Sequence, residues 1–126
     1  MTPCRHPSIC FIPAVLVAAG IAFLSLMEQP VAAPLWTIND KLAHGLMYAA
    51  LAASMMYAMV AIRRTRFAHF LLVGSCAAAY GLIMEILQHY CTRTRSGDKM
   101  DLLADCVGIL TVLILIALWR RFTISR

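Results

Sequence analysis

The sequence has few charged residues. Of its 126 residues only 13% are Asp, Glu, Lys or Arg, whereas 62% are hydrophobic. Soluble globular domains carry about 25% charged and roughly 45–50% apolar residues, so this composition excludes an ordinary water-soluble domain. It is instead typical of a chain that is immersed in a lipid bilayer. The length leaves room for a single domain over residues 1–126.

The sequence also lacks the cysteine patterns of metal-binding or cross-linked proteins. Its five cysteines are an odd number, with no CxxC pair and no zinc-type spacing. Cys10, Cys76 and Cys106 lie inside apolar runs, where a free cysteine usually serves as a small packing residue. We therefore expect no disulfide framework.

A soluble basic face is missing too, although the net charge is +5. The basic residues stand in short clusters between long apolar runs, so no polar surface remains to hold a phosphate backbone. We therefore exclude nucleic acid as a partner and expect membrane lipids instead. The sequence contains no internal repeat, low-complexity tract or second domain.

Four apolar runs are each long enough to cross a membrane, because about 20 apolar residues in a helix span the hydrocarbon core. The first run follows Arg5, and Val31-Ala32-Ala33 resembles a signal-peptide cleavage site. Pro34 would obstruct that cleavage, so we favour an uncleaved helix. The sequence predicts an all-α, polytopic membrane protein, a bundle of four transmembrane helices at approximately residues 9–28, 41–62, 67–90 and 98–119.

The basic residues predict the orientation of this bundle. Four spans place both termini on one side, with seven basic residues: Arg5, Arg63, Arg64, Arg66, Arg120, Arg121 and Arg126. The other side holds four: Lys41, Arg93, Arg95 and Lys99. Because cytoplasmic loops carry an excess of Lys and Arg, both termini are predicted to be cytoplasmic.

Polar residues gather at the predicted outer end of three helices: Asp40, Lys41, His44 and Tyr48 in the second, Glu85, Gln88 and His89 in the third, Asp98, Asp101 and Asp105 in the fourth. Spacings of three, four or seven place Asp40, His44 and Tyr48 on one helix face, and likewise the residues of the third helix and the acids of the fourth. The helix dipole accounts for first-turn acids such as Asp40 and Asp98. It does not account for His44, Glu85 or Asp105, because intramembrane ionisable residues persist when they are paired and face a bundle interior or an aqueous cavity. We therefore predict an outward-facing polar pocket, with a structural network of ion pairs as the alternative.

These residue types suit proton transfer or the binding of a head group. The candidates are Glu85, His44 and Asp101 for catalysis, Lys41, Tyr48, Gln88 and Arg95 for substrate binding, and Asp40, Asp98 and Asp105 for support. Asp101 and Asp105 are alternatively ligands of a hard divalent cation. The spacing gives no ligand geometry, so the cofactor stays open and no metal ligand is assigned.

Two spaced motifs of mixed charge stand inside these hydrophobic runs. The first is Asp40-Lys41-Leu42-Ala43-His44, followed by Tyr48 and Leu51, and the second runs Gly81, Glu85, Gln88, Arg95-Ser96-Gly97-Asp98, Asp101, Asp105 and Gly108. With these motifs the chain resembles the VanZ-like family of small bacterial membrane proteins over residues 40–113. Asp105 stands where the family usually has asparagine. A slightly longer loop after Gln88 leaves open whether Arg93 or Arg95 fills the family's arginine position.

The resemblance implies a multi-helix protein of the bacterial inner membrane. The founder of the family is associated with resistance to the glycopeptide antibiotic teicoplanin. That phenotype is not carried over as this chain's function. From the outward-facing polar pocket we expect action on, or binding of, an envelope lipid or lipid-linked head group, and the resemblance extends this expectation to the cell envelope or the response to glycopeptide antibiotics. Whether the protein is an enzyme or a non-catalytic binding protein stays open. The asparagine of the family favours an uncharged Asp105 that acts as a hydrogen-bond donor.

Overall fold

The computed structural model describes residues 7–27, 37–62, 65–92 and 98–124, and the regular structure of these residues is entirely helical. A short helix, α1 (Pro7–Cys10), leads into α2 (Ile12–Leu26). Three long helices follow: α3 (Thr37–Ala61), α4 (Phe67–Cys91) and α5 (Lys99–Ile124). Within these described residues, four helical segments are long and apolar enough to cross a membrane. This confirms the prediction of an all-α chain with four such helices and indicates an integral membrane protein.

The first apolar run was predicted to form one helix over residues 9–28, but the structure divides it near its start into α1 and α2. Pro13 stands in the first turn of α2, and because proline has no N–H it cannot continue the ladder from a preceding turn. The chain therefore turns at Phe11, whose N–H bonds the carbonyl of Ser8 at 3.2 Å. Cys10 is buried and disulfide-bonded, which contradicts our expectation of a packing residue without a disulfide.

Two other helices extend beyond their apolar cores. α3 begins at Thr37 rather than at residue 41, and α5 continues to Ile124 rather than ending at residue 119. Backbone hydrogen bonding does not stop where the side chains become polar, so hydropathy marks only the membrane-embedded part of a helix. Arg120 and Arg121, predicted to follow the fourth helix, therefore lie on it.

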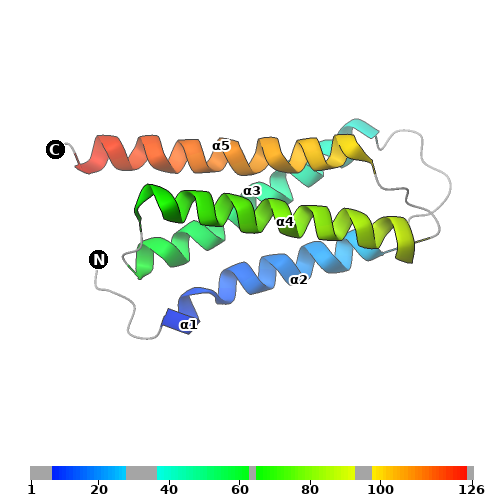
Figure 1. Ribbon diagram of the computed structural model, residues 1–126, viewed down its shortest axis with the longest axis horizontal. Helices are drawn as coiled ribbons and strands as arrows, with labels where there is room; N and C mark the ends of the chain where they lie inside the picture. The colour runs from blue at the N-terminus through cyan, green and yellow to red at the C-terminus, as the bar shows by residue number, and fades with distance from the viewer. Residues whose placement is uncertain (1–6, 28–36, 63–64, 93–97, 125–126) are drawn as a thin grey trace.

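The long segments lie alongside one another, and the start of α1 and the end of α5 are at the same end of the bundle (Figure 1). In this view α3 crosses behind α4, and its first turns lie beside the first turns of α5. The core consists of aliphatic side chains, methionines and one tyrosine: Ile21, Tyr48, Leu51, Ala52, Met56, Val73, Ala77, Met84, Ile109 and Leu113. Many large apolar side chains instead face outward, as expected for helices in lipid.

α3 and α5 approach so closely that glycine is required where they cross. A Cβ atom on Gly108 would lie 2.0 Å from the carbonyl oxygen of Gly45, which is far inside van der Waals contact. In α4, Ala77 and Gly81 are buried, whereas Cys76, which was predicted to be a packing residue, is exposed.

Hydrogen bonds between a side chain and a backbone carbonyl fix α2 against α4. The hydroxyl of Tyr80 donates to the carbonyl of Ala18 at 2.7 Å, and Nε2 of Gln88 donates to the carbonyl of Ser25 at 3.1 Å. A side chain can use such a carbonyl without breaking the helix, because each oxygen has two lone pairs. α2 thus closes the bundle on the side away from α5.

Candidate functional site

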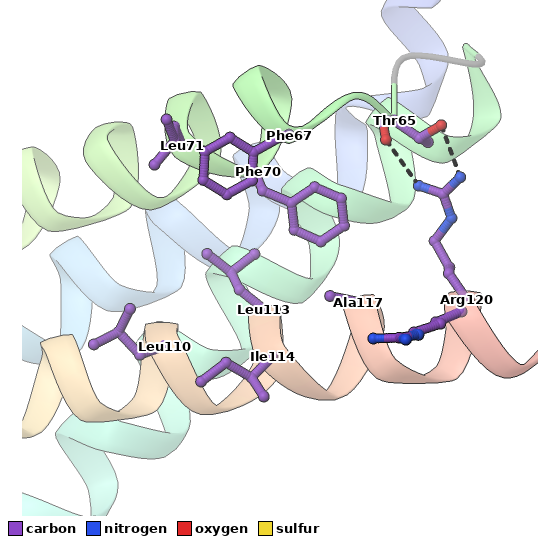
Figure 2. A pocket seen from close by; sticks show the side chains of 10 residues that line it. Thr65, Phe67, Phe70, Leu71, Leu110, Leu113, Ile114, Ala117 and Arg120 are labelled. Atoms are coloured by element: carbon purple, nitrogen blue, oxygen red, sulfur yellow. Dashed lines mark hydrogen bonds between the residues drawn. The ribbon is translucent and has the colours of Figure 1, made fainter.

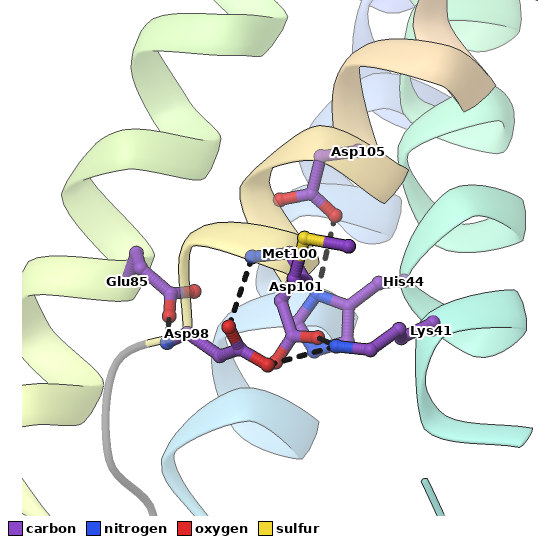
Figure 3. A network of polar contacts seen from close by, with 7 residues as sticks. All are labelled: Lys41, His44, Glu85, Asp98, Met100, Asp101 and Asp105. Carbon is purple, nitrogen blue, oxygen red and sulfur yellow. Dashed lines mark hydrogen bonds and ion pairs between the residues drawn. The ribbon is translucent and has the colours of Figure 1, made fainter. Parts of the chain in front are cut away.

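Lys41 joins the first turns of α3 and α5. Its Nζ lies 2.8 Å from Oδ2 of Asp98 and 2.9 Å from Oδ1 of Asp101 (Figure 3). The Lys41 side chain is 37% exposed and that of Asp98 47%, so solvent screens the outer ion pair. Such exposed pairs contribute little to stability. Asp101 is only 13% exposed and forms the inner side of the cluster. The structure thus brings Lys41, predicted as a substrate-binding residue, into contact with two of the predicted acids.

Asp98 also caps α5. Its Oδ1 accepts a hydrogen bond from the N–H of Met100 at 2.9 Å, the usual arrangement for a carboxylate just before a first helical turn. The hydrogen bond from Lys41, with that from Met100, holds the pKa of Asp98 below its ordinary value. The N–H of Asp98 in turn donates to Oε1 of Glu85, so α4 is tied to the start of α5 as well.

One turn deeper, His44 of α3 contacts Asp105 of α5. Nδ1 of His44 lies 3.1 Å from Oδ1 of Asp105, and the two residues are 3% and 1% exposed. The contact requires one proton between the ring nitrogen and the carboxyl oxygen, and either group can carry it. The sequence had favoured an uncharged Asp105 unless a base met it. The structure supplies that base.

Gly81 of α4 completes the wall behind this pair. A Cβ atom at Gly81 would lie 3.1 Å from Oδ2 of Asp105 and 3.2 Å from Cε1 of Tyr48. Tyr48 is only 1% exposed, and its ring centroid lies 6.3 Å from that of Tyr80. In this conformation Tyr48 is a packing residue beneath the network rather than an accessible binding group, which differs from its predicted role.

Among the described residues, three donors from two helices could together hold a divalent cation. One carboxylate oxygen each of Asp40 and Asp101 and one ring nitrogen of His44 lie within 4.8 Å of one another. With Nδ1 of His44 facing Asp105, Nε2 is left for a ligand, an orientation common in metal-binding histidines. The structure thus groups Asp101 with Asp40 and His44, not with Asp105 as the sequence suggested. The Lys41 ammonium on Oδ1 of Asp101 would compete with the ion.

Glu85 connects the network to an open hollow between α4 and α5. The hollow has a volume of about 280 Å³, and Glu85 lines it together with His89 and Lys99. Leucine, isoleucine and tyrosine side chains form the rest of its wall. Figure 3 shows the Glu85 carboxylate beside the start of α5, where Oε1 accepts a hydrogen bond from the N–H of Asp98. Its second oxygen is the one left for a bound molecule.

The structure brings together most of the predicted residues: Asp40, Lys41, His44, Glu85, Asp98, Asp101 and Asp105. Gln88 is different, because its side chain is buried and its amide is used to hold Ser25 of α2. Arg95, with Arg93, lies outside the described residues. Sequence reasoning missed Gly45. In the sequence, Gly45 is simply a glycine that follows the motif histidine His44. No sequence pattern indicates that the backbone of a second helix packs against it.

No family model, curated protein or solved structure matches the chain.

Proposed function

We propose that the protein is a VanZ-like membrane protein of the bacterial inner membrane that binds, or chemically modifies, the head group of an envelope lipid at the polar end of its bundle. Three helices contribute acidic and basic groups that meet at one end of the bundle. A lipid presents its polar group at that depth while its chains stay in the bilayer. The motifs around His44 and Asp101 supply the family resemblance.

The observation that carries this proposal is the placement of Glu85. It belongs to the network through Asp98, and it also lines the hollow between α4 and α5. A carboxylate with one oxygen fixed by a backbone N–H is held in one orientation, as an acid–base group or a binding group must be. Lys99 and His89 at the same hollow suit an anionic or hydroxyl-bearing head group.

The pocket faces outward if the termini are cytoplasmic, as the seven arginines on the terminal side predict. The disulfide at Cys10 favours the opposite orientation, with the N-terminus outside, because disulfides persist in oxidising compartments rather than in the cytoplasm. We keep the cytoplasmic orientation, since the positive charges are distributed over both ends of the chain and a loop. A place in the envelope or in glycopeptide response rests on the resemblance alone.

The alternative is a structural network of ion pairs. It is favoured by one observation: in the described part of the chain, every buried side-chain nitrogen and oxygen has a hydrogen-bond partner. A satisfied network can hold α3, α4 and α5 together without binding anything. Removing one partner of a buried pair typically costs about 3–5 kcal/mol, so a purely structural role would appear as loss of the folded protein.

Two conservative variants separate these roles. Glu85→Gln keeps an oxygen to accept the Asp98 N–H, and Asp101→Asn keeps one for Lys41, but both remove the carboxylate charge. We expect each variant to accumulate in membranes like the parent. If the carboxylates transfer protons, turnover should fall by about 100-fold or more. His44→Ala should also abolish function.

The measurement is a comparison of lipid extracts from cells that make the parent, a variant or no protein. The parent should change the abundance or the head group of a lipid species, and the two carboxylate variants should not. His69→Ala is the control, since His69 accepts the N–H of Arg66 far from the network. Parent-like extracts from Glu85→Gln and Asp101→Asn cells would reject the proposal. Disappearance of these variants from the membrane would establish the structural role instead.

A further inference from the structure

A second site lies at the other end of the bundle, between α4 and α5. It is an open groove of about 670 Å³, which is within the roughly 300–1,000 Å³ range of small-molecule sites. Its wall is apolar, with Phe67, Phe70 and Leu71 from α4 and Leu113 and Ile114 from α5 (Figure 2). These residues belong to the membrane-spanning parts of the two helices. An apolar groove in these segments suits a lipid chain, because lipid tails are as apolar as its wall.

Two arginines form the polar end of this groove. Arg120 donates to the carbonyl of Thr65 at 3.1 Å and to its hydroxyl at 2.8 Å, which fixes one edge of the guanidinium (Figure 2). The remaining N–H groups of Arg120 are left for another acceptor, since a guanidinium has five. Arg121 also lines the groove and is exposed.

In the part of the chain that the structure describes, no carboxylate side chain pairs with these arginines. The sequence has no Asp or Glu between residues 41 and 84, and none after Asp105. The negative end of the α5 dipole favours basic residues in the last turns, but it does not explain why they stand at the mouth of an apolar groove. An anion that continues into an apolar chain complements both features, and guanidinium groups bind phosphate well.

We propose that this groove binds an anionic phospholipid, with an acyl chain along the apolar wall and the phosphate at Arg121 and the free edge of Arg120. The site is at the opposite end of the bundle from the polar network, so it is independent of the head-group function proposed above. Bound lipid would bridge α4 and α5 at the end where Arg120 already holds Thr65.

The test is native mass spectrometry of the purified protein with equimolar phosphatidylglycerol and phosphatidylcholine. A basic residue near an anionic lipid favours it by about fivefold, so the parent should retain phosphatidylglycerol at least about fivefold over phosphatidylcholine. Arg121→Gln should remove most of this preference. Arg66→Gln is the matched control: it removes the same charge near the same end, from an exposed residue that does not line the groove.

A second pair of variants tests the groove itself. Ala117→Phe fills it and leaves both arginines in place, so retention of both lipids should fall by about fivefold or more. Leu115→Phe places the same ring on an exposed position of α5 outside the groove and should retain lipid like the parent. Equal retention of the two lipids by the parent would overturn the proposal. So would equal losses in Arg66→Gln and Arg121→Gln, or a protein dimer that Ala117→Phe dissociates.

Discussion

Replacing Gly108 by alanine should separate α3 from α5 and disrupt the network beside their crossing. The added Cβ atom would lie 2.0 Å from the carbonyl oxygen of Gly45, 2.8 Å from its carbonyl carbon and 3.0 Å from its Cα. All three atoms belong to backbone, so no side chain can turn away. His44 precedes Gly45, and Asp105 lies about one helical turn before Gly108, so the separation acts directly on their contact.

The size of the effect follows from these distances. Carbon and oxygen rarely approach within about 3.4 Å, so the helices must move apart by about 1.4 Å at the crossing. The His44–Asp105 distance of 3.1 Å would then exceed hydrogen-bonding range. Overpacking costs about 1–3 kcal/mol, and leaving a buried polar group without its partner costs about 1–3 kcal/mol. We expect the free energy of unfolding to fall by about 3–5 kcal/mol.

The assay is reversible denaturation in mixed micelles, followed by helical circular dichroism. Gly20→Ala is the matched control, because nothing lies within 4 Å of the Cβ it adds. Alanine is the better helix former by about 0.5–1 kcal/mol, so this variant should match or exceed the parent in stability. Gly74→Ala should fall between the two, since its Cβ meets only a movable methyl of Leu113 at 3.3 Å. Equal stabilities of Gly108→Ala and Gly20→Ala would refute the close crossing.

Three further predictions concern the network and the topology. Asp105→Asn should unfold within about 0.5 kcal/mol of the parent, because the amide can donate to or accept from Nδ1 of His44 as the carboxyl group does. Asp105→Ala should lose about 1–3 kcal/mol. A large loss of function in Asp105→Asn that Mg²⁺ or Ca²⁺ restores would show that the charge holds a cation. Because the pKa of Asp98 is lowered in the folded state, its contribution to stability is present above the ordinary value near 3.9 and is lost as the pH falls through the folded value. Melting temperatures recorded against pH should show this acid limb in the parent and a weaker one in Lys41→Gln, and identical profiles would contradict it. Reporter fusions after Arg66 and Arg126 should read cytoplasm, and those near Pro34 and Thr94 outside; the reverse pattern would place the Cys10 disulfide outside and the polar network inside.

Much of this architecture can be predicted from the sequence. Four apolar runs of sufficient length make four helices, because the bilayer requires every backbone group to be satisfied within its own segment. The spacing of Asp98, Asp101 and Asp105, and of Asp40 and His44, puts each set on one helix face. Since the loops order the helices up and down, these faces had to meet at the same end of the bundle. The sequence is therefore sufficient to predict that the polar residues gather at one end of the bundle.

The tertiary structure alone decided which partners meet. Helical periodicity gives the face of a residue but not the angle and depth at which two helices cross, and these depend on a backbone contact between Gly45 and Gly108 that no local pattern specifies. That crossing pairs His44 with Asp105 and leaves Asp101 to Lys41. The contact of Gln88 with Ser25 of α2 has the same origin. The sequence predicts the helix face on which Gln88 lies, but it does not predict that α2 packs against this face.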